Sequence, residues 1–158
     1  MKIGVVSDSH GDIHALRSAL KSIGDADLVI HLGDGINDID AVSQYIKTEI
    51  IKVKGNCDFN SGLDAERIIM AENKRLLITH GHNYNVKSDY LNIHYKAIKE
   101  DAHMVLFGHT HFPEIIENNN IILFNPGSIS KPRGTGRTYG IVIIEKGLIM
   151  PKIWDLHL

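Results

Sequence analysis

The chain has 158 residues, of which 43% are hydrophobic and 23% charged, and its formal net charge is -2. This length can bury a core without cross-links, the single cysteine excludes an internal disulfide, and the near-neutral charge offers no basic surface to nucleic acid or acidic membranes. The N-terminal apolar run is too short for a signal peptide or a membrane span. We expect a soluble, cytoplasmic protein with one domain over residues 1–158 and no membrane or nucleic-acid partner; a homo-oligomer remains open.

The first third of the chain alternates predicted strands with predicted helices. Apolar runs at residues 2–7, 27–33 and 50–53 are typical of buried strands. Residues 12–23 and 36–46 carry apolar side chains at helical spacing and are predicted to be helices. Strands and helices that alternate in this way form a parallel sheet, and ligand sites in such sheets lie at the carboxyl ends of the strands.

After residue 66 the pattern changes to hairpins. We predict antiparallel strand pairs that turn at residues 72–74, 118–120 and 146–147. Residues 88–100 are predicted to be a helix, and residues 103–108 a buried strand. The chain shows no internal repeat, low-complexity tract or linker. The fold class is therefore α/β, with two sheets and flanking helices.

Polar side chains follow five of the predicted strands at the point where each strand ends. Because the carboxyl ends of strands in an open α/β sheet converge on one crevice, these side chains are expected to be neighbours. Two Asp, four His and one Asn are too many for one tetrahedral metal and suit two metals of five or six coordination. One carboxylate must then bridge the two ions, and Asp34 is the natural candidate. The seven residues are Asp8, His10, Asp34, Asn56, His80, His109 and His111.

Glycines precede several of these residues. Gly33, Gly55 and Gly108 are expected to let the chain turn sharply as it leaves each strand. A single D-x-H, GDGIND or GHTH motif is typical of an ordinary loop. The conjunction of five such motifs, each after a buried-strand pattern, is the specific signal.

The chain resembles the calcineurin-like metallophosphoesterases, especially their small YfcE-like phosphodiesterase branch. The resemblance rests on five motifs in a fixed order: D-x-H, GD with a second Asp, GN-x-D, HGH and GH-x-H. The resemblance runs through almost the whole chain and implies a four-layer α/β/β/α sandwich of two mixed sheets. It also implies two divalent metal ions, with Mn²⁺ first among candidates that include Ni²⁺, Fe²⁺, Co²⁺ and Zn²⁺. By this resemblance one ion is bound by Asp8, His10 and His111, the other by Asn56, His80 and His109, and Asp34 bridges them.

One position departs from the family pattern. The second Asp of the family's GD-x-x-D falls at Asp38, four residues after Asp34. In the family this carboxylate forms hydrogen bonds around the metal ligands, and the same use is plausible for Asp38.

Cys57 stands where many family members have a His that protonates or polarises the leaving oxygen. A thiol is a poor proton donor, and two nearby dications would lower its pKa, so acid catalysis by Cys57 is expected to be weak. A nucleophilic cysteine is an alternative, but Leu63 occupies the position where the arginine of a cysteine phosphatase would stand. A cysteine that only packs is the third alternative.

Two further positions are predicted to contact substrate beside Cys57. His82 lies two residues after His80 and could contact substrate or hold a ligand. Arg133 and Arg137 lie in a glycine-rich loop with Ser128 that suits phosphate contact, although a solvated loop fits equally well. His14, one helical turn after His10, is expected on the surface.

These features predict a phosphodiesterase that hydrolyses a small phosphate ester by attack of a metal-bound hydroxide at a dinuclear centre, with Asp34, Asn56 and Cys57 as catalytic residues. The two dications and two carboxylates leave a net charge of about +2, or about +1 with a bridging hydroxide. The competing hypothesis is a non-enzymatic interaction scaffold like the small subunit of retromer, which has this fold and an incomplete metal set. The complete ligand set favours the enzyme.

Overall fold

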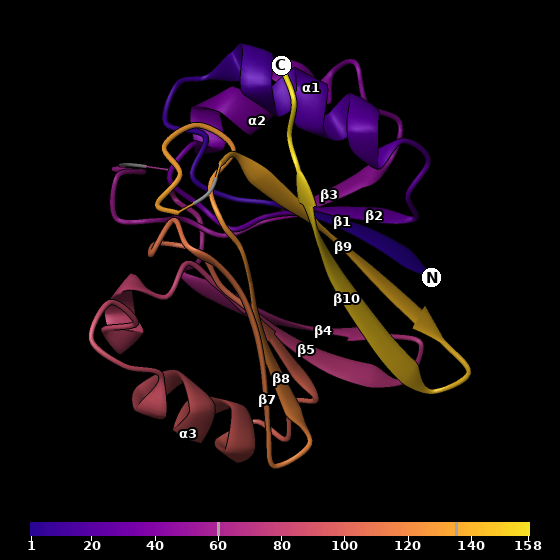
Figure 1. Cartoon of the computed structure of the whole chain (residues 1–158), viewed down its shortest axis with the longest axis vertical. Helices are drawn as coiled ribbons and strands as arrows, with labels where there is room; N and C mark the ends of the chain where they lie inside the picture. The colour runs from indigo at the N-terminus through magenta and orange to yellow at the C-terminus, as the bar shows by residue number, and fades with distance from the viewer. Residues whose placement is uncertain (60, 135) are drawn as a thin grey trace.

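The computed structural model describes residues 1–59, 61–134 and 136–158. Within these residues, two five-stranded sheets have the strand orders β10-β9-β1-β2-β3 and β4-β5-β6-β8-β7. Figure 1 shows the sheets face to face, with α1 and α2 outside the first and α3 outside the second. The predicted four-layer α/β/β/α sandwich is confirmed.

The first sheet combines strands from both ends of the chain. Strands β1, β2 and β3 are parallel to one another, and β3 forms one edge of the sheet. Strand β9 runs antiparallel to both β1 and β10. The parallel strands end in register, so the loops that follow them leave at one edge of the sheet. The strands are β1 (Lys2–Val6), β2 (Leu28–His31), β3 (Glu49–Lys52), β9 (Thr138–Glu145) and β10 (Leu148–Asp155).

The second sheet is also mixed. Strands β5, β6 and β8 are parallel, and the edge strands β4 and β7 pair antiparallel with β5 and β8. The loops after β5 and β6 therefore leave this sheet at one edge as well. The strands are β4 (Glu66–Ala71), β5 (Lys74–Thr79), β6 (Met104–Leu106), β7 (Pro113–Asn118) and β8 (Ile121–Pro126).

Three apolar clusters hold the layers together. The largest lies between the sheets and includes Val5, Ile30 and Phe124. A second cluster joins the first sheet to α1 (Ile13–Ile23) and α2 (Ile36–Ser43), and a third joins the second sheet to α3 (Leu91–Lys99). No helix in the described residues has the length and apolar character to cross a bilayer.

The three predicted hairpins are present, and the backbone shows why they turn where they do. Two-residue hairpin turns require positive φ angles. Such angles are found at Glu72 and Asn73, at Asn119 and Asn120, and at Lys146. The helix predicted over residues 36–46 ends at Ser43, because the next N–H groups, those of Tyr45 and Ile46, bond to carbonyls three residues back. The helix predicted over residues 88–100 spans Leu91–Lys99, and a short 3-10 helix, η1 (His82–Tyr84), was not predicted.

Candidate metal centre

The loops that follow β1, β2, β5 and β6 bring six of the seven predicted ligands together. The potential ligand atoms of Asp8, His10 and His111 lie within 4.8 Å of one another, and those of Asp34, His80 and His109 form a second such group. These residues come from loops of both sheets and are separated by up to about a hundred positions in the sequence. The two groups correspond to the two ligand sets that the resemblance implies, with Asn56 left out.

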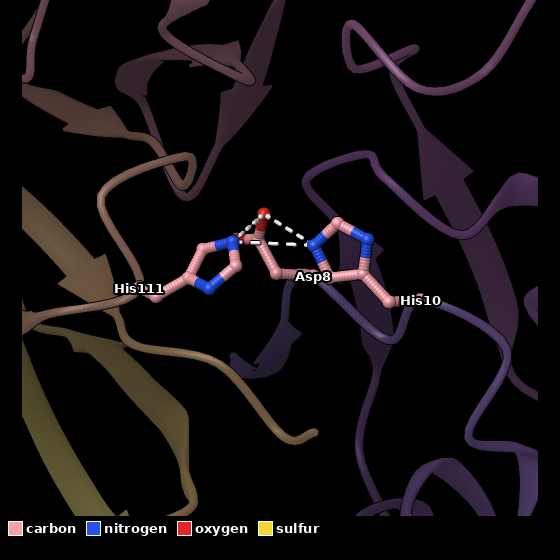
Figure 2. Close-up of side chains that lie close together, drawn as sticks. All are labelled: Asp8, His10 and His111. Atoms are coloured by element: carbon pink, nitrogen blue, oxygen red, sulfur yellow. Dashed lines mark hydrogen bonds and ion pairs between the residues drawn. The ribbon is translucent and has the colours of Figure 1, made fainter. Parts of the chain in front are cut away.

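The first group points three side chains at one spot. Figure 2 shows Asp8 between His10 and His111, with the ring nitrogens of both histidines turned toward its carboxylate. The Oδ1 atom of Asp8 lies 3.1 Å from Nε2 of His111 and 3.8 Å from Nε2 of His10. The two Nε2 atoms are 3.2 Å apart.

The hydrogen bonds around this group leave one oxygen of Asp8 and one ring nitrogen of His111 facing the centre. Ser7 and the backbone N–H of His109 donate to Asp8 Oδ2, whereas Asp8 Oδ1 is buried and accepts no hydrogen bond from the described residues. His111 Nδ1 donates to the carbonyl of Lys131 at 2.7 Å, which leaves the Nε2 lone pair facing inward. A bound cation would stabilise the orphaned buried oxygen of Asp8 and accept the ring nitrogens beside it, so the residues fit a metal ion.

The second group is built in the same way. His80 Nδ1 donates to the carbonyl of Leu32 at 2.8 Å, so Nε2 is the ring nitrogen left to bind a metal ion. This Nε2 lies 3.4 Å from Oδ2 of Asp34 and 3.2 Å from Nδ1 of His109. The Oδ2 atom of Asp34 is also 3.9 Å from Nε2 of His10, a member of the first group. Asp34 therefore lies between the two groups.

The charges of the site keep its carboxylates ionised. Burial opposes ionisation of Asp34, but the hydrogen bond and charge of His80 outweigh it, and the pKa of Asp34 is held well below its usual value. Burial lowers the pKa of His80, but Asp34 and Asp8 more than compensate and raise it. Burial and then the charge of His80 lower the pKa of His109 to about 4. A neutral His109 is the form that binds a metal.

Five of the six grouped ligands adopt a left-handed backbone conformation. The φ angles are positive at Asp8, His10, Asp34, His109 and His111, although none of them is a glycine. This conformation costs free energy in a residue with a side chain, and such residues cluster at functional sites. Their coincidence with the predicted ligand positions strengthens the assignment of a site.

Asp38 holds the loop that carries Asp8 and His10. Its Oδ2 atom accepts hydrogen bonds from Ser9 Oγ at 2.6 Å and from the backbone N–H of Gly11 at 2.8 Å. The hydrogen bonding expected for Asp38 is therefore present, despite its shifted position in the sequence.

Asp58 is a site residue whose role the sequence did not reveal. Its carboxylate accepts four backbone hydrogen bonds, from the N–H groups of Asp34, Gly35, Ile36 and Gly55, at 2.7 to 3.0 Å. Three of these donors lie at the loop between β2 and α2, and the fourth precedes Asn56. Asp58 thus fastens two ligand loops to each other. The Asp in GN-x-D was a signal, but only the structure shows what it binds.

The glycines before the ligands do not share one role. Gly33 has a positive φ angle of 99°, as expected for a sharp turn. Gly55 and Gly108 do not; a Cβ atom on Gly55 would collide with the Asp34 carboxylate, and one on Gly108 with Ser7 Oγ. The prediction of a turning role was wrong for these two, which are glycines because the ligand loops approach them closely.

Asn56 and Cys57 lie at the exposed side of the centre. The Asn56 amide donates to Cys57 Sγ at 3.4 Å, and both side chains are exposed. Cys57 Sγ also forms a group within 4.8 Å with His10 and Asp34, and its backbone N–H donates to Asp34 Oδ1. Partial desolvation and the Asp34 carboxylate raise the pKa of the Cys57 thiol to about 11. The protein's own charges therefore favour a protonated thiol.

The predicted substrate contacts have different environments. His82 lies beside the second group, with ring centroids 5.4 Å from His80 and 6.1 Å from His109, and its Nδ1 is buried without a hydrogen-bond partner among the described residues. The Arg133 side chain is exposed, and its backbone N–H donates to the carbonyl of His111. Arg137 is paired with Asp12 at 2.6 Å.

Two expectations about neighbouring residues can be settled. Ser128 is buried and donates its hydroxyl to the backbone carbonyl of Asp8, so it supports a ligand loop and does not face a phosphate. His14 is exposed, as predicted.

A mixed α/β/β/α sandwich with Asp and His side chains gathered at the carboxyl ends of its strands defines the class of metallophosphoesterases. The chain belongs to the calcineurin-like phosphoesterase superfamily. Residues 1–147 match the family model of the calcineurin-like phosphoesterase superfamily domain. The resemblance inferred from the motifs is therefore confirmed. Members of this family depend on metal ions, and the grouped side chains are candidates for holding them.

Two curated proteins match nearly the whole chain. "Probable metallophosphoesterase YsnB" from Bacillus subtilis (strain 168) is 31% identical over 157 residues, covering 98% of this chain and 91% of that protein. "Phosphodiesterase YfcE" from Escherichia coli (strain K12) is 27% identical over 169 residues, covering 90% of this chain and 87% of that protein.

Solved structures share the fold. A predicted phosphoesterase from Streptococcus pneumoniae TIGR4 superposes with a TM-score of 0.81 at 31% identity, covering 98% of this chain and 88% of that one. Vps29 from Entamoeba histolytica, in complex with Zn²⁺, superposes with a TM-score of 0.75 over 99% of this chain and all of its own, at 20% identity, and shows the fold alone.

Proposed function

We propose that the protein is a phosphodiesterase with a dinuclear metal centre. The observation that carries this proposal is the position of Asp34, whose Oδ2 lies 3.4 Å from His80 Nε2 of one group and 3.9 Å from His10 Nε2 of the other. A carboxylate that lies between two adjacent ligand sets is in a suitable position to bridge two metal ions. Asn56 would complete the second set after a rotation of its exposed side chain toward the centre.

When bound, two divalent ions would lower the pKa of a water molecule and polarise the phosphoryl group of the substrate. Asp8 and Asp34 hold negative charge at the centre, and the neutral His109 offers a lone pair. His111 and His80 are fixed in the correct tautomer by the carbonyls of Lys131 and Leu32.

The periphery of the site carries positive charge for an anionic substrate. Burial lowers the pKa of His10, His82 and His109, and the charges of Lys131, Lys54 and Lys87, respectively, contribute in the same direction. His82 and Arg133 are proposed to contact the phosphate ester, and Cys57 to lie next to its leaving oxygen. A small phosphate diester is the proposed substrate class, supported by the similarity to YfcE.

A non-enzymatic scaffold is the second candidate, because the likeness to Vps29 fits it as well as it fits an enzyme. The orphaned Oδ1 of Asp8 and the inward lone pairs argue against a purely structural role for these loops. A scaffold would have no need for five ligands in left-handed backbone conformations at one place.

Elemental analysis of the protein after reconstitution with Mn²⁺, combined with hydrolysis of bis-p-nitrophenyl phosphate, tests the proposal. We expect two ions per chain and activity that disappears on chelation and returns with metal. The Asp34→Asn variant should lose most of the bound metal and most of the activity, because the change weakens the binding of both ions at once. Circular dichroism must show that this variant is folded. Full activity after exhaustive chelation, or in the folded variant, would rule out the dinuclear mechanism.

A further inference from the structure

A pocket of about 550 Å³ lies in the outer helical layer of the first sheet, away from the metal centre. Its lining includes Gly24, which directly follows α1, Val29 in the first half of β2, and Thr48, which directly precedes β3. The amino ends of β2 and β3 lie at the opposite edge of the sheet from the carboxyl ends that carry the ligands. The pocket is therefore a separate feature and not an extension of the metal centre.

The pocket lies beside the C-terminal ends of the two covering helices. Helix α1 has 11 residues and α2 only 8, so α2 stops at Ser43 and the chain returns to β3 through residues 44–48. The end of α1 and this return segment form the walls. The interior is apolar and is lined by Leu20, Val29, Val42 and Ile46. Its volume lies within the range of about 300 to 1,000 Å³ that small-molecule sites occupy.

The rim carries two cations and no anion. Arg17 and Lys21 lie one turn apart on α1, so they share one helix face, and neither forms an ion pair with a carboxylate in the described residues. No Asp or Glu lines the pocket. The Arg17 guanidinium lies 5.6 Å from the ring centroid of Tyr45, which closes the other side of the rim. Like charges at this spacing repel each other, and an anion between them would remove the repulsion.

We propose that this pocket binds a small organic anion with an apolar body. The body would fill the space between Leu20, Val42 and Ile46, and a single acidic group would lie between Arg17 and Lys21, near the Tyr45 ring. An apolar interior with one convergent charged edge is the usual arrangement of a small-molecule site. This site is independent of the proposed phosphodiesterase activity.

Decanoate and its uncharged analogue decanol are suitable probes, used below their aggregation concentrations and followed by calorimetry and by amide chemical shifts of the full chain. We expect saturable binding of one decanoate per chain, with shifts concentrated at the end of α1 and in residues 42–48. Decanol should bind roughly tenfold more weakly, because it cannot form the charge-assisted contacts.

Paired variants test the role of the charges. Arg17→Ala with Lys21→Ala should raise the Kd of decanoate roughly tenfold and leave decanol binding unchanged. Arg17→Lys with Lys21→Arg keeps both charges and should keep the affinity. The matched control is Arg67→Ala with Lys99→Ala, which removes one exposed Arg and one exposed Lys elsewhere. The proposal is overturned if wild type shows no saturable binding, if the Ala pair binds like the control, or if the shifts lie around the metal ligands or the exposed face of β10.

Discussion

The carboxylate of Asp58 accepts the backbone N–H of Asp34 at 2.7 Å, and this contact helps to position the candidate bridging residue. The same carboxylate accepts the N–H groups of Gly35 and Ile36, at the start of α2. The N-cap residue Gly35 has no side chain that could do this, so Asp58 replaces the missing cap from a distant loop. Asp58 therefore couples the end of the β2 strand, the start of α2 and the loop that carries Asn56.

Asp58→Asn should weaken metal binding by roughly 10- to 100-fold although Asp58 is not a predicted ligand. An amide has one acceptor oxygen where the carboxylate has two, and its NH₂ group would face backbone donors. The measurement is a Mn²⁺ titration by calorimetry, with thermal unfolding in chelator as a check on folding. Asp64→Asn, at an exposed carboxylate in the same region, is the matched control. Equal metal affinity in both variants would show that Asp58 does not position the site.

A second prediction concerns His31 and the pH dependence of stability. His31 is fully buried; its Nδ1 accepts the N–H of Gly33, and its Nε2 lies 3.3 Å from Ser9 Oγ. Burial lowers the pKa of His31 from 6.5 to about 4. Above pH 6.5 the ring is neutral in both the folded and the unfolded chain. Between pH 6.5 and 4 only the unfolded chain gains a proton at this position, so stability must fall as the pH falls.

The full loss from this one group is about 3 kcal/mol. Urea unfolding in chelator at pH 7.5 and pH 5 should therefore show a larger loss of unfolding free energy in wild type than in His31→Gln, which does not titrate. The other histidines are common to both proteins and cancel in the difference. Parallel losses in the two proteins would mean that His31 is protonated in the folded state or does not contribute.

The sequence was sufficient to predict much of this arrangement. Buried-strand patterns ending in Asp, His or Asn predicted candidate ligands, six of which the structure brings together, because parallel strands end at a common edge whatever lies between them. Hairpin turns were predictable because Asn and Gly tolerate the left-handed conformation that such turns need. The four layers were expected from the family resemblance and not from the patterns, and the strand orders were not predicted.

Other features depend on contacts that no local pattern encodes. Asp58 acts on Asp34 from 24 positions away, and its partners are backbone N–H groups, which every residue other than proline has. The need for glycine at position 55 arises from the Asp34 carboxylate beside it, which belongs to another loop. Ile46 continues the helical spacing of α2 and made the helix look longer than it is, although the chain there already turns toward β3. These are tertiary effects that override local propensity.

A third prediction separates the roles of Cys57. Without metal, burial and the Asp34 carboxylate raise the pKa of its thiol to about 11, so the protein's own charges do not prepare it as a nucleophile near neutral pH. Cys57→Ala should keep measurable metal-dependent hydrolysis of bis-p-nitrophenyl phosphate, and Cys57→His should raise the rate by supplying a better proton donor. Metal content measured on each variant shows whether the centre is intact. Complete loss of activity in Cys57→Ala with both metals retained, or a trapped phosphocysteine, would show that Cys57 is a nucleophile.

The last prediction is that phosphodiesters are preferred over phosphomonoesters. By the family resemblance, related protein phosphatases carry an arginine after the second Asp of GD-x-x-D, where it can hold a dianionic phosphate in a bidentate grip. Here Asp38 is followed by Ile39, which is fully buried in the apolar cluster beneath α2. Arg137 is paired with Asp12 and is not free to replace that arginine.

Without the bidentate pair, a monoester loses roughly 1.5 to 3 kcal/mol of binding, or about ten- to a hundredfold. The lysines around the centre contribute point charges without a planar fork, so they offset only part of this loss. The measurement is kcat/KM for bis-p-nitrophenyl phosphate and for p-nitrophenyl phosphate with the same metal, in wild type, Arg133→Ala and Lys131→Ala. We expect the diester to be preferred in all three. A clear preference for the monoester that disappears in Arg133→Ala, but not in Lys131→Ala, would show that the exposed Arg133 reaches the phosphate and restores the grip, and the assignment to diesters would then be wrong.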